Sequence, residues 1–137
     1  MKYLLDTNIL SESVKTAPDK SVLIMLERHQ HEIVTAALIW HELQYGCQRL
    51  PLSHKRDIIE SFLNDVVQNM LILPYDKRAA AWHAEERARL SSQGKMPSFV
   101  DGQIAAIASV NGLILVTRNI SDFEPFSELK TENWYGA

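Results

Sequence analysis

The sequence predicts an α/β fold in which helices cover both faces of a central parallel sheet. Its candidate strands are short runs of consecutive apolar residues, a pattern typical of strands that are buried on both faces. Stretches with the apolar spacing of amphipathic helices lie between these runs, which is the order expected for a parallel sheet. The 137 residues, 46% hydrophobic and 23% charged, suit one globular domain. We therefore expect a single domain over residues 1–137.

The first part of the chain is predicted to run from strand to helix and back to strand. Residues 2–5 form a short, mostly apolar run that ends in a polar triplet at residues 6–8, where small polar side chains commonly cap the start of a helix. The next apolar residues recur at helical spacing until the polar stretch at residues 27–32. A β-branched run at residues 33–35 then predicts the second strand.

The middle of the chain predicts a helical hairpin, a strand and a further helix. Apolar residues recur at helical spacing over residues 38–50 and again over residues 58–67, with a proline at the end of the first segment. The apolar run at residues 70–73 predicts a buried strand. Residues 79–90 are rich in alanine and arginine and predict a helix that ends before a glycine.

The last helix and strand have the clearest boundaries. After a loop at residues 95–97, Ser98 is a suitable residue to begin a helix, and Asn111-Gly112 is a typical left-handed helix end. Five apolar or β-branched residues follow at once, at residues 113–117. We interpret this run as the most clearly buried strand of the sheet.

Composition and charge restrict the kinds of site that the chain can form. The formal net charge of −3 gives no overall attraction to a polyanion, so nucleic-acid binding would need a local basic patch and bound cations. Cys47 is the only cysteine, which excludes an internal disulfide and a cysteine-rich zinc site. The apolar runs are too short for a signal peptide or a membrane span. We expect a cytoplasmic protein that does not enter a membrane.

Polar side chains follow the first and the last of the predicted strands. Asp6 ends the first strand, while Thr117, Asn119 and Asp122 lie at or just beyond the end of the last. In parallel α/β sheets, ligands bind at the carboxyl ends of the strands. If these two strands are neighbours, the four side chains converge there.

Two further carboxylates, on predicted helices, can join this group, although each acid also has a simpler explanation. Glu42 lies within an otherwise apolar helix, and a lone glutamate there usually faces solvent. Asp101 lies in the first turn of its helix, where Ser98 and Asp101 also fit a capping box. Asp6 can be a helix cap, and Asp122 can organise a turn. Together, the carboxylates suit Mg²⁺ or Mn²⁺ and metal-assisted phosphodiester hydrolysis.

Four segments resemble, in their order along the chain, the motifs of PIN-domain ribonucleases of the VapC toxin kind. They are residues 3–10 with Asp6, residues 40–46 with Glu42, residues 99–108 with Asp101, and the closing motif at residues 115–123. The resemblance spans nearly the whole chain. It implies that Asp6, Glu42 and Asp101 bind the metal and that these three and Asp122 are catalytic.

The closing motif departs from the family pattern at one position. Many relatives carry a further acid where this chain has Asn119, so that either Asp122 substitutes for it or Asn119 contacts a metal-bound water. Asn8, Thr117 and Asn119 are expected to be supporting polar groups. Arg118 is the basic residue that we expect to contact RNA phosphates.

The resemblance implies an endoribonuclease toxin with a cognate VapB-like antitoxin, and a homodimer that meets DNA only through that antitoxin. A catalytically degenerate PIN-like binding protein is an alternative, because of Asn119. A phosphotransferase of the haloacid-dehalogenase or receiver type is another, since both classes place an aspartate after a first strand. Asn8 argues against the former, which needs a second acid there. Arg118 and Asn119 argue against the latter, which needs a lysine after the last strand.

Overall fold

Five short parallel strands form the centre of the structure, a computed structural model that describes residues 1–136. The order across the sheet is β3-β2-β1-β4-β5, and every neighbouring pair is parallel. The strands are β1 (Tyr3–Leu5), β2 (Ile33–Ala36), β3 (Ile72–Leu73), β4 (Ile114–Val116) and β5 (Thr131–Glu132). The predicted parallel α/β sheet is confirmed.

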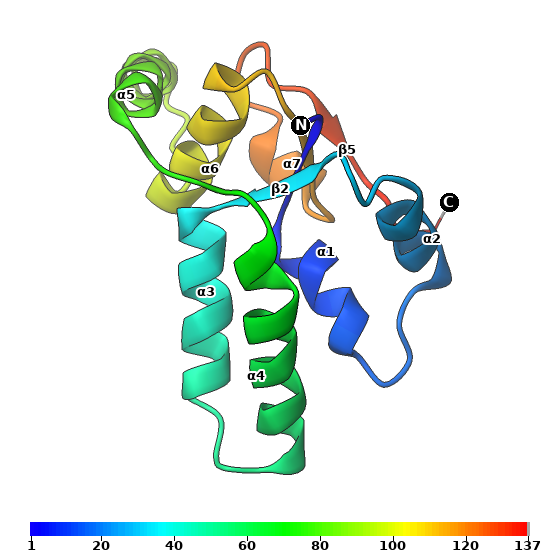
Figure 1. The fold of residues 1–137 in the computed structure, drawn as a ribbon. Coiled ribbons are helices and arrows are strands. Elements are labelled where there is room, and N and C mark those ends of the chain that lie inside the picture. The colour runs from blue at the N-terminus through cyan, green and yellow to red at the C-terminus, as the bar shows by residue number, and fades with distance from the viewer. Residues whose placement is uncertain (137) are drawn as a thin grey trace.

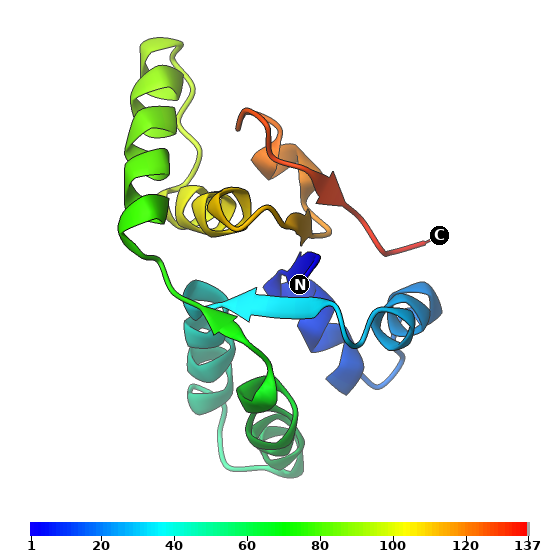
Figure 2. The same cartoon turned by 45° about the horizontal axis from the view of Figure 1, so that its top comes forward.

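Helices cover both faces of this sheet, as predicted (Figures 1 and 2). Right-handed crossovers place α1 to α4 on one face and α5 to α7 on the other. The helices are α1 (Thr7–Ser11), α2 (Lys20–Arg28), α3 (Ala37–Gln48), α4 (His54–Asp65), α5 (Lys77–Ser92), α6 (Phe99–Val110) and α7 (Ile120–Phe123), with 3-10 turns η1 (Glu12–Val14) and η2 (Val67–Asn69). Within residues 1–136, none of the helices has the length and apolar content needed to cross a membrane.

The direction of the chain across the sheet reverses between β1 and β4. From β1 the chain proceeds to β2 and β3 on one side, and it then returns to β4 and β5 on the other. The connections on the two sides therefore cover opposite faces, and they leave a crevice at the carboxyl ends of β1 and β4. The backbone N–H of Asp6 donates to the carbonyl of Val116 at 2.9 Å, which joins the two strands at this point.

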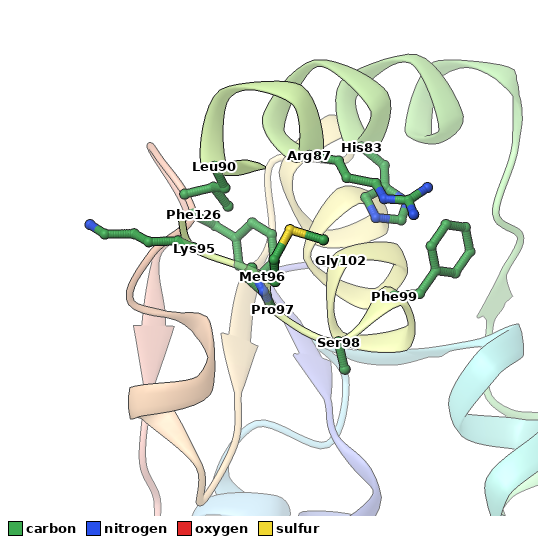
Figure 3. A pocket seen from close by; sticks show the side chains of 10 residues that line it. All are labelled: His83, Arg87, Leu90, Lys95, Met96, Pro97, Ser98, Phe99, Gly102 and Phe126. Atoms are coloured by element: carbon green, nitrogen blue, oxygen red, sulfur yellow. The ribbon is translucent and has the colours of Figure 1, made fainter. Parts of the chain in front are cut away.

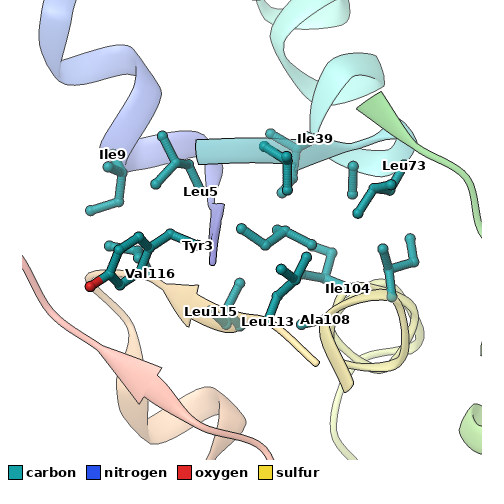
Figure 4. Close-up of a cluster of buried hydrophobic side chains, with 14 of the residues drawn as sticks. Tyr3, Leu5, Ile9, Ile39, Leu73, Ile104, Ala108, Leu113, Leu115 and Val116 are labelled. Carbon is teal, nitrogen blue, oxygen red and sulfur yellow. The ribbon is translucent and has the colours of Figure 1, made fainter. Parts of the chain in front are cut away.

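The hydrophobic core fills both sides of the sheet (Figure 4). Leu5 of β1 and Leu115 of β4 are fully buried. Ile39 of α3 and Ile104 of α6 pack in the same cluster, although these helices belong to opposite faces. The short strands carry consecutive apolar residues because both of their faces are covered.

Both ends of α6 form as the sequence predicts. The Ser98 hydroxyl accepts the backbone N–H of Asp101 at 3.1 Å, which caps the first turn. At the other end, Gly112 has a φ of 64°, and the N–H of Leu113 donates to the carbonyl of Ala108 at 2.9 Å. This is the hydrogen-bond pattern of a left-handed helix cap. It turns the chain directly into β4.

Several boundaries and small elements differ from the prediction. The buried strand predicted at residues 70–73 is wrong in extent: only Ile72–Leu73 pairs, and Leu71 is 53% exposed. β3 is an edge strand, and β2 is the one strand that pairs with it. The turn predicted at Asp122 is part of α7, and β5 was not predicted. Both elements are very short, and the two residues of β5 are polar, so no apolar run marks them.

Glu86 gives the fold a dependence on pH, because this buried side chain of α5 joins the helix to the segment after α7. It accepts hydrogen bonds from the Arg89 guanidinium at 2.8 and 3.0 Å and from the Ser127 N–H at 2.6 Å. These bonds, with that of Arg89 the largest influence, lower the pKa of Glu86 from 4.5 to about 2. The stabilisation is therefore complete above about pH 4.5 and is lost as the pH falls towards 2.

We expect Glu86→Gln to lower the free energy of unfolding by about 1.5–3 kcal/mol at neutral pH, the range for hydrogen bonds to a charged group. The difference from wild type is expected to shrink as the pH falls below 4.5. Urea unfolding of both proteins across this pH range measures it. A difference that stays constant with pH would contradict the assigned role of the Glu86 carboxylate.

Candidate active site

Asp6 stands where β1 ends and α1 begins, and both of its carboxylate oxygens accept hydrogen bonds. Oδ1 accepts the backbone N–H of Thr7 at 2.8 Å, so Asp6 is the helix cap that the sequence allows. Oδ2 accepts the Thr117 hydroxyl at 2.8 Å, and this hydroxyl in turn accepts the N–H of Asn119 at 3.1 Å. The carboxylate is therefore held in one orientation between β1 and β4.

Glu42 reaches the same crevice from α3. It is exposed, as expected of a glutamate on a helix, and its Oε2 accepts the Thr7 hydroxyl at 2.6 Å. Thr7 thus donates its backbone N–H to Asp6 and its side-chain hydroxyl to Glu42. One residue of α1 fixes two carboxylates that are far apart in the sequence.

Asp101 enters from the first turn of α6. The cap of that helix comes from the Ser98 hydroxyl, which accepts the backbone N–H of Asp101. The half-buried carboxylate of Asp101 lines the cavity that also contains Asp6 and Glu42. The helix start and the acidic cluster are therefore compatible at this residue.

These side chains share a cavity of about 440 Å³ at the carboxyl ends of β1 and β4. Its lining residues are Asp6, Thr7, Asn8, Ser11, Lys15, Glu42, Asp101, Ile104 and Asn119. Of the predicted site residues, the lining therefore contains Asp6, Asn8, Glu42, Asp101 and Asn119. Ser11 and Lys15 also line the cavity, and no motif in the sequence points to them.

Thr117, Asp122 and Arg118, which are also predicted site residues, stand around the cavity and are not in its lining. Thr117 is fully buried beneath Asp6. Asp122 is exposed on α7. Arg118 is exposed, its backbone N–H lies 3.4 Å from Oδ1 of Asn8, and its guanidinium lies over the ring of Tyr135.

Burial and neighbouring negative charges raise the pKa values of Asp6 and Asp101. The pKa of Asp6 is raised, with burial as the largest cause and the charges of Glu42 and Asp122 as further ones. The hydrogen bonds from Thr117 and Thr7 oppose this rise without cancelling it. Burial also raises the pKa of Asp101, and the charges of Asp122 and Asp6 add to this effect. Mutual repulsion of this kind favours a cation in the cavity.

The chemistry of the donor groups fits a hard divalent cation. The cavity offers carboxylate oxygens and amide oxygens, the ligands that Mg²⁺ and Mn²⁺ prefer. Within residues 1–136, no three histidine, cysteine, aspartate or glutamate side chains are close enough together to form a ready-made metal site. The carboxylates therefore share a cavity but do not form a complete coordination shell.

Two other hollows border this region. A groove of about 780 Å³ lies between α1 with η1 and the hairpin of α3 and α4, and it shares Thr7, Ser11, Lys15 and Glu42 with the carboxylate cavity. A smaller hollow of about 240 Å³ lies between α5 and α6 and contains none of the carboxylates named above (Figure 3). The groove is thus continuous with the acidic cavity.

Comparisons with known proteins agree with this architecture. A family model described as PIN domain matches residues 3–127. The chain is 35% identical to Ribonuclease VapC2 of Haemophilus influenzae and 33% identical to the tRNA(fMet)-specific endonuclease VapC of Shigella flexneri, each time over 98% of both chains. A chain of the solved VapBC2 complex from Rickettsia felis, bound to a DNA fragment from its promoter, matches with a TM-score of 0.83 and 29% identity over 98% of this chain and 99% of that chain.

Proposed function

Because this chain belongs to the PIN domain family, we propose that it is a metal-dependent endoribonuclease that acts as the toxin of a toxin-antitoxin pair. The observation that carries this proposal is the single cavity that Asp6, Glu42 and Asp101 line from three separate segments. Relatives named as ribonucleases match almost the full length of the chain, which supports RNA as the substrate. The observed strand order also differs from the 2-1-3-4-5 order of receiver domains.

In this proposal, Asp6, Glu42 and Asp101 would hold Mg²⁺ or Mn²⁺. The bound ion would supply an activated water and would neutralise charge on the phosphate in the transition state. Thr117 and Thr7 orient the carboxylates through the hydrogen bonds described above. No side-chain nucleophile is needed.

Asn119 and Asp122 have separate parts in this site. Asn119 lines the cavity, so we assign to it the contact with metal-bound water. Asp122 lies outside the lining, and we assign to it the negative charge that favours a cation between Asp6 and Asp101. Asn8 lines the cavity as a supporting polar group, and Arg118 stands beside it as a contact for RNA phosphates.

We expect purified protein to cleave RNA only when Mg²⁺ or Mn²⁺ is present and to leave 5′-phosphate and 3′-hydroxyl ends. The reason is that water activated by the bound ion, and not the RNA 2′-hydroxyl, would be the nucleophile. Initiator tRNA is the first substrate to test, because a relative is named for it, and end mapping across total RNA extends the search. Cyclic-phosphate ends, or full activity in EDTA, would contradict the mechanism. A folded protein that cleaves nothing would support the degenerate binding protein instead.

We further propose that a VapB-like antitoxin binds in the groove beside the carboxylate cavity. The groove is lined by apolar side chains of α4, and Ile58 among them is 44% exposed. Its continuity with the cavity would let a bound segment place a basic side chain among the carboxylates. In this account, the protein meets DNA only through the antitoxin. A homodimer of the 15.6 kDa chain also stays a prediction, which light scattering tests.

Ile58→Asp is expected to weaken binding of the co-expressed antitoxin at least tenfold, about 1.4 kcal/mol, because it places a charge in the apolar groove. Val66→Asp is the matched control. Val66 is a similarly exposed apolar residue at the end of the same helix, but it does not line the groove. Calorimetric titration gives both affinities. Equal losses for the two variants would place the antitoxin elsewhere.

A further inference from the structure

Glu12 is a buried carboxylate outside the proposed ligand set. Its side chain is only 3% exposed, and it accepts hydrogen bonds from the Asp19 N–H at 2.7 Å and from the Tyr135 hydroxyl at 2.6 Å. The Lys15 ammonium lies 2.9 Å from its Oε2. The hydrogen bond of Lys15, followed by that of Tyr135, lowers the pKa of Glu12 to about 2. Glu12 is therefore an anion at neutral pH.

Lys15, the cation that Glu12 holds, faces the proposed site. Its side chain is 47% exposed, and it lines both the carboxylate cavity and the adjoining groove. It is the only cationic residue of the cavity lining in the described part of the chain. Its ammonium is therefore available to an anion that approaches the cavity.

Tyr135 connects Glu12 to a second cation. Its hydroxyl lies 2.6 Å from Glu12 and 2.9 Å from the carbonyl of Asn8, on the first helix of the site. The Arg118 guanidinium lies over the Tyr135 ring, 4.5 Å from its centroid, a favourable cation–π arrangement. The end of the chain thus holds Arg118 beside the loop that carries Asn119.

The charge of the cavity explains why such an anchor is needed. A phosphodiester that approaches Asp6, Glu42 and Asp101 is repelled, and the net charge of −3 gives no overall attraction. A lysine without a partner would itself pair with those carboxylates and compete with the metal. Glu12 holds Lys15 in a fixed position at the wall of the cavity.

We propose that Glu12 is a positioning residue that holds Lys15 directly, and Arg118 through Tyr135, as the two cations that bind the RNA backbone beside the scissile phosphate. This inference rests on the proposed ribonuclease function. It assigns roles to three residues outside the family motifs. Lys15 contacts a phosphate, Glu12 holds Lys15, and Tyr135 holds Arg118.

The experiment measures binding of a fluorescein-labelled single-stranded RNA by anisotropy over a range of salt concentrations, in EDTA. The parent protein is Asp101→Asn, so that the RNA is not cleaved. Each phosphate contact to single-stranded RNA contributes about 0.7 to the slope of log affinity against log salt. Lys15→Met is expected to reduce this slope by about 0.7 and the affinity about fivefold, while Lys15→Arg keeps both.

Lys130→Met is the matched control. Lys130 is exposed just before β5, at the opposite end of the parallel sheet from the cavity, so this variant is expected to bind like the parent. An unchanged slope for Lys15→Met, or an equal loss of RNA affinity for Lys130→Met, would overturn this inference and leave the proposed function standing. A parent that shows no salt-dependent RNA binding would overturn the proposed function as well.

Glu12→Gln tests the positioning role through the sign of its effect. Removing a negative charge should strengthen binding to RNA if only net charge matters, whereas loss of the anchor is expected to weaken binding about fivefold. Thermal unfolding shows whether this variant is folded. Tyr135→Phe removes the hydroxyl without changing any charge and is also expected to weaken binding. Tighter binding by folded Glu12→Gln, or unchanged binding by Tyr135→Phe, would overturn the positioning role.

Discussion

Asp101→Asn is expected to reduce RNA cleavage about a thousandfold while the metal-free protein stays at least as stable as wild type. Loss of a metal ligand removes several kcal/mol of transition-state stabilisation, which corresponds to a factor of this size. The variant keeps the backbone N–H that the Ser98 hydroxyl accepts, so the start of α6 is preserved. It also relieves repulsion from Asp6 and Asp122, worth about 1 kcal/mol near a protein surface.

Thermal unfolding in EDTA and in excess Mn²⁺, together with a cleavage assay, measures both effects. Wild type is expected to gain melting temperature with Mn²⁺, because the ion binds only the folded state, and Asp101→Asn to gain much less. Asp57→Asn is the matched control, since Asp57 lies in the first turn of α4 and lines neither the cavity nor the groove. Equal Mn²⁺ shifts, with cleavage retained by Asp101→Asn, would remove Asp101 from the site.

Gly102→Ala is expected to lower the free energy of unfolding by about 1–3 kcal/mol and the melting temperature by about 4–12 °C. A Cβ atom at Gly102 would meet the imidazole of His83, 2.7 Å from its Cδ2. That ring has little freedom to move: His83 is 4% exposed, its Nδ1 is 2.9 Å from the Tyr75 hydroxyl, and the Phe99 ring packs on it (Figure 3). Because Gly102 follows Asp101, the strain also disturbs the start of α6.

Gly46→Ala provides the comparison for this steric argument. Gly46 also lies inside a helix, α3, but apart from its chain neighbours and the backbone of its own helix no atom lies within 4 Å of the added Cβ. Alanine there is expected to stabilise the protein by about 0.4–1 kcal/mol. His83→Ala should remove most of the cost of Gly102→Ala in the double mutant, which urea unfolding measures. Equal effects at the two glycines, or no rescue, would contradict the clash with His83.

The parallel sheet covered by helices and the positions of Asp6 and Asp101 could be predicted because local patterns determine them, whereas the order of the strands across the sheet could not. An uninterrupted apolar run marks β4, and Gly112 marks the helix end before it. Asp6 and Asp101 occupy positions that follow directly from a strand end and a helix start, so the parallel topology brings them together. No local pattern placed Glu42 in the site, since its helix is ordinary in composition. The motif resemblance identified it.

The contacts of Glu12 with Lys15 and Tyr135 could not be predicted from the sequence. Glu12 and Lys15 lie in and just after a short 3-10 turn without apolar periodicity, where a charged pair usually faces solvent. Tyr135 contacts Glu12 from a position 123 residues away in the chain. None of these three residues belongs to a motif, and only the folded chain shows that Glu12 is buried between Lys15 and Tyr135. Contacts of this range depend on the tertiary fold.

A crystal structure of the protein with Mn²⁺, examined by anomalous scattering, tests whether the carboxylates of the cavity bind a metal ion. We expect one or two Mn²⁺ peaks in the cavity between β1 and β4, bound by carboxylate oxygens of Asp6 and Asp101, with Glu42 bound directly or through water, at about 2.0–2.2 Å for direct ligands. The same crystals of Asp101→Asn should lose or weaken the peak. A fully occupied Mn²⁺ elsewhere, with this cavity empty at high Mn²⁺, would contradict the claim that these carboxylates form the metal site of a ribonuclease.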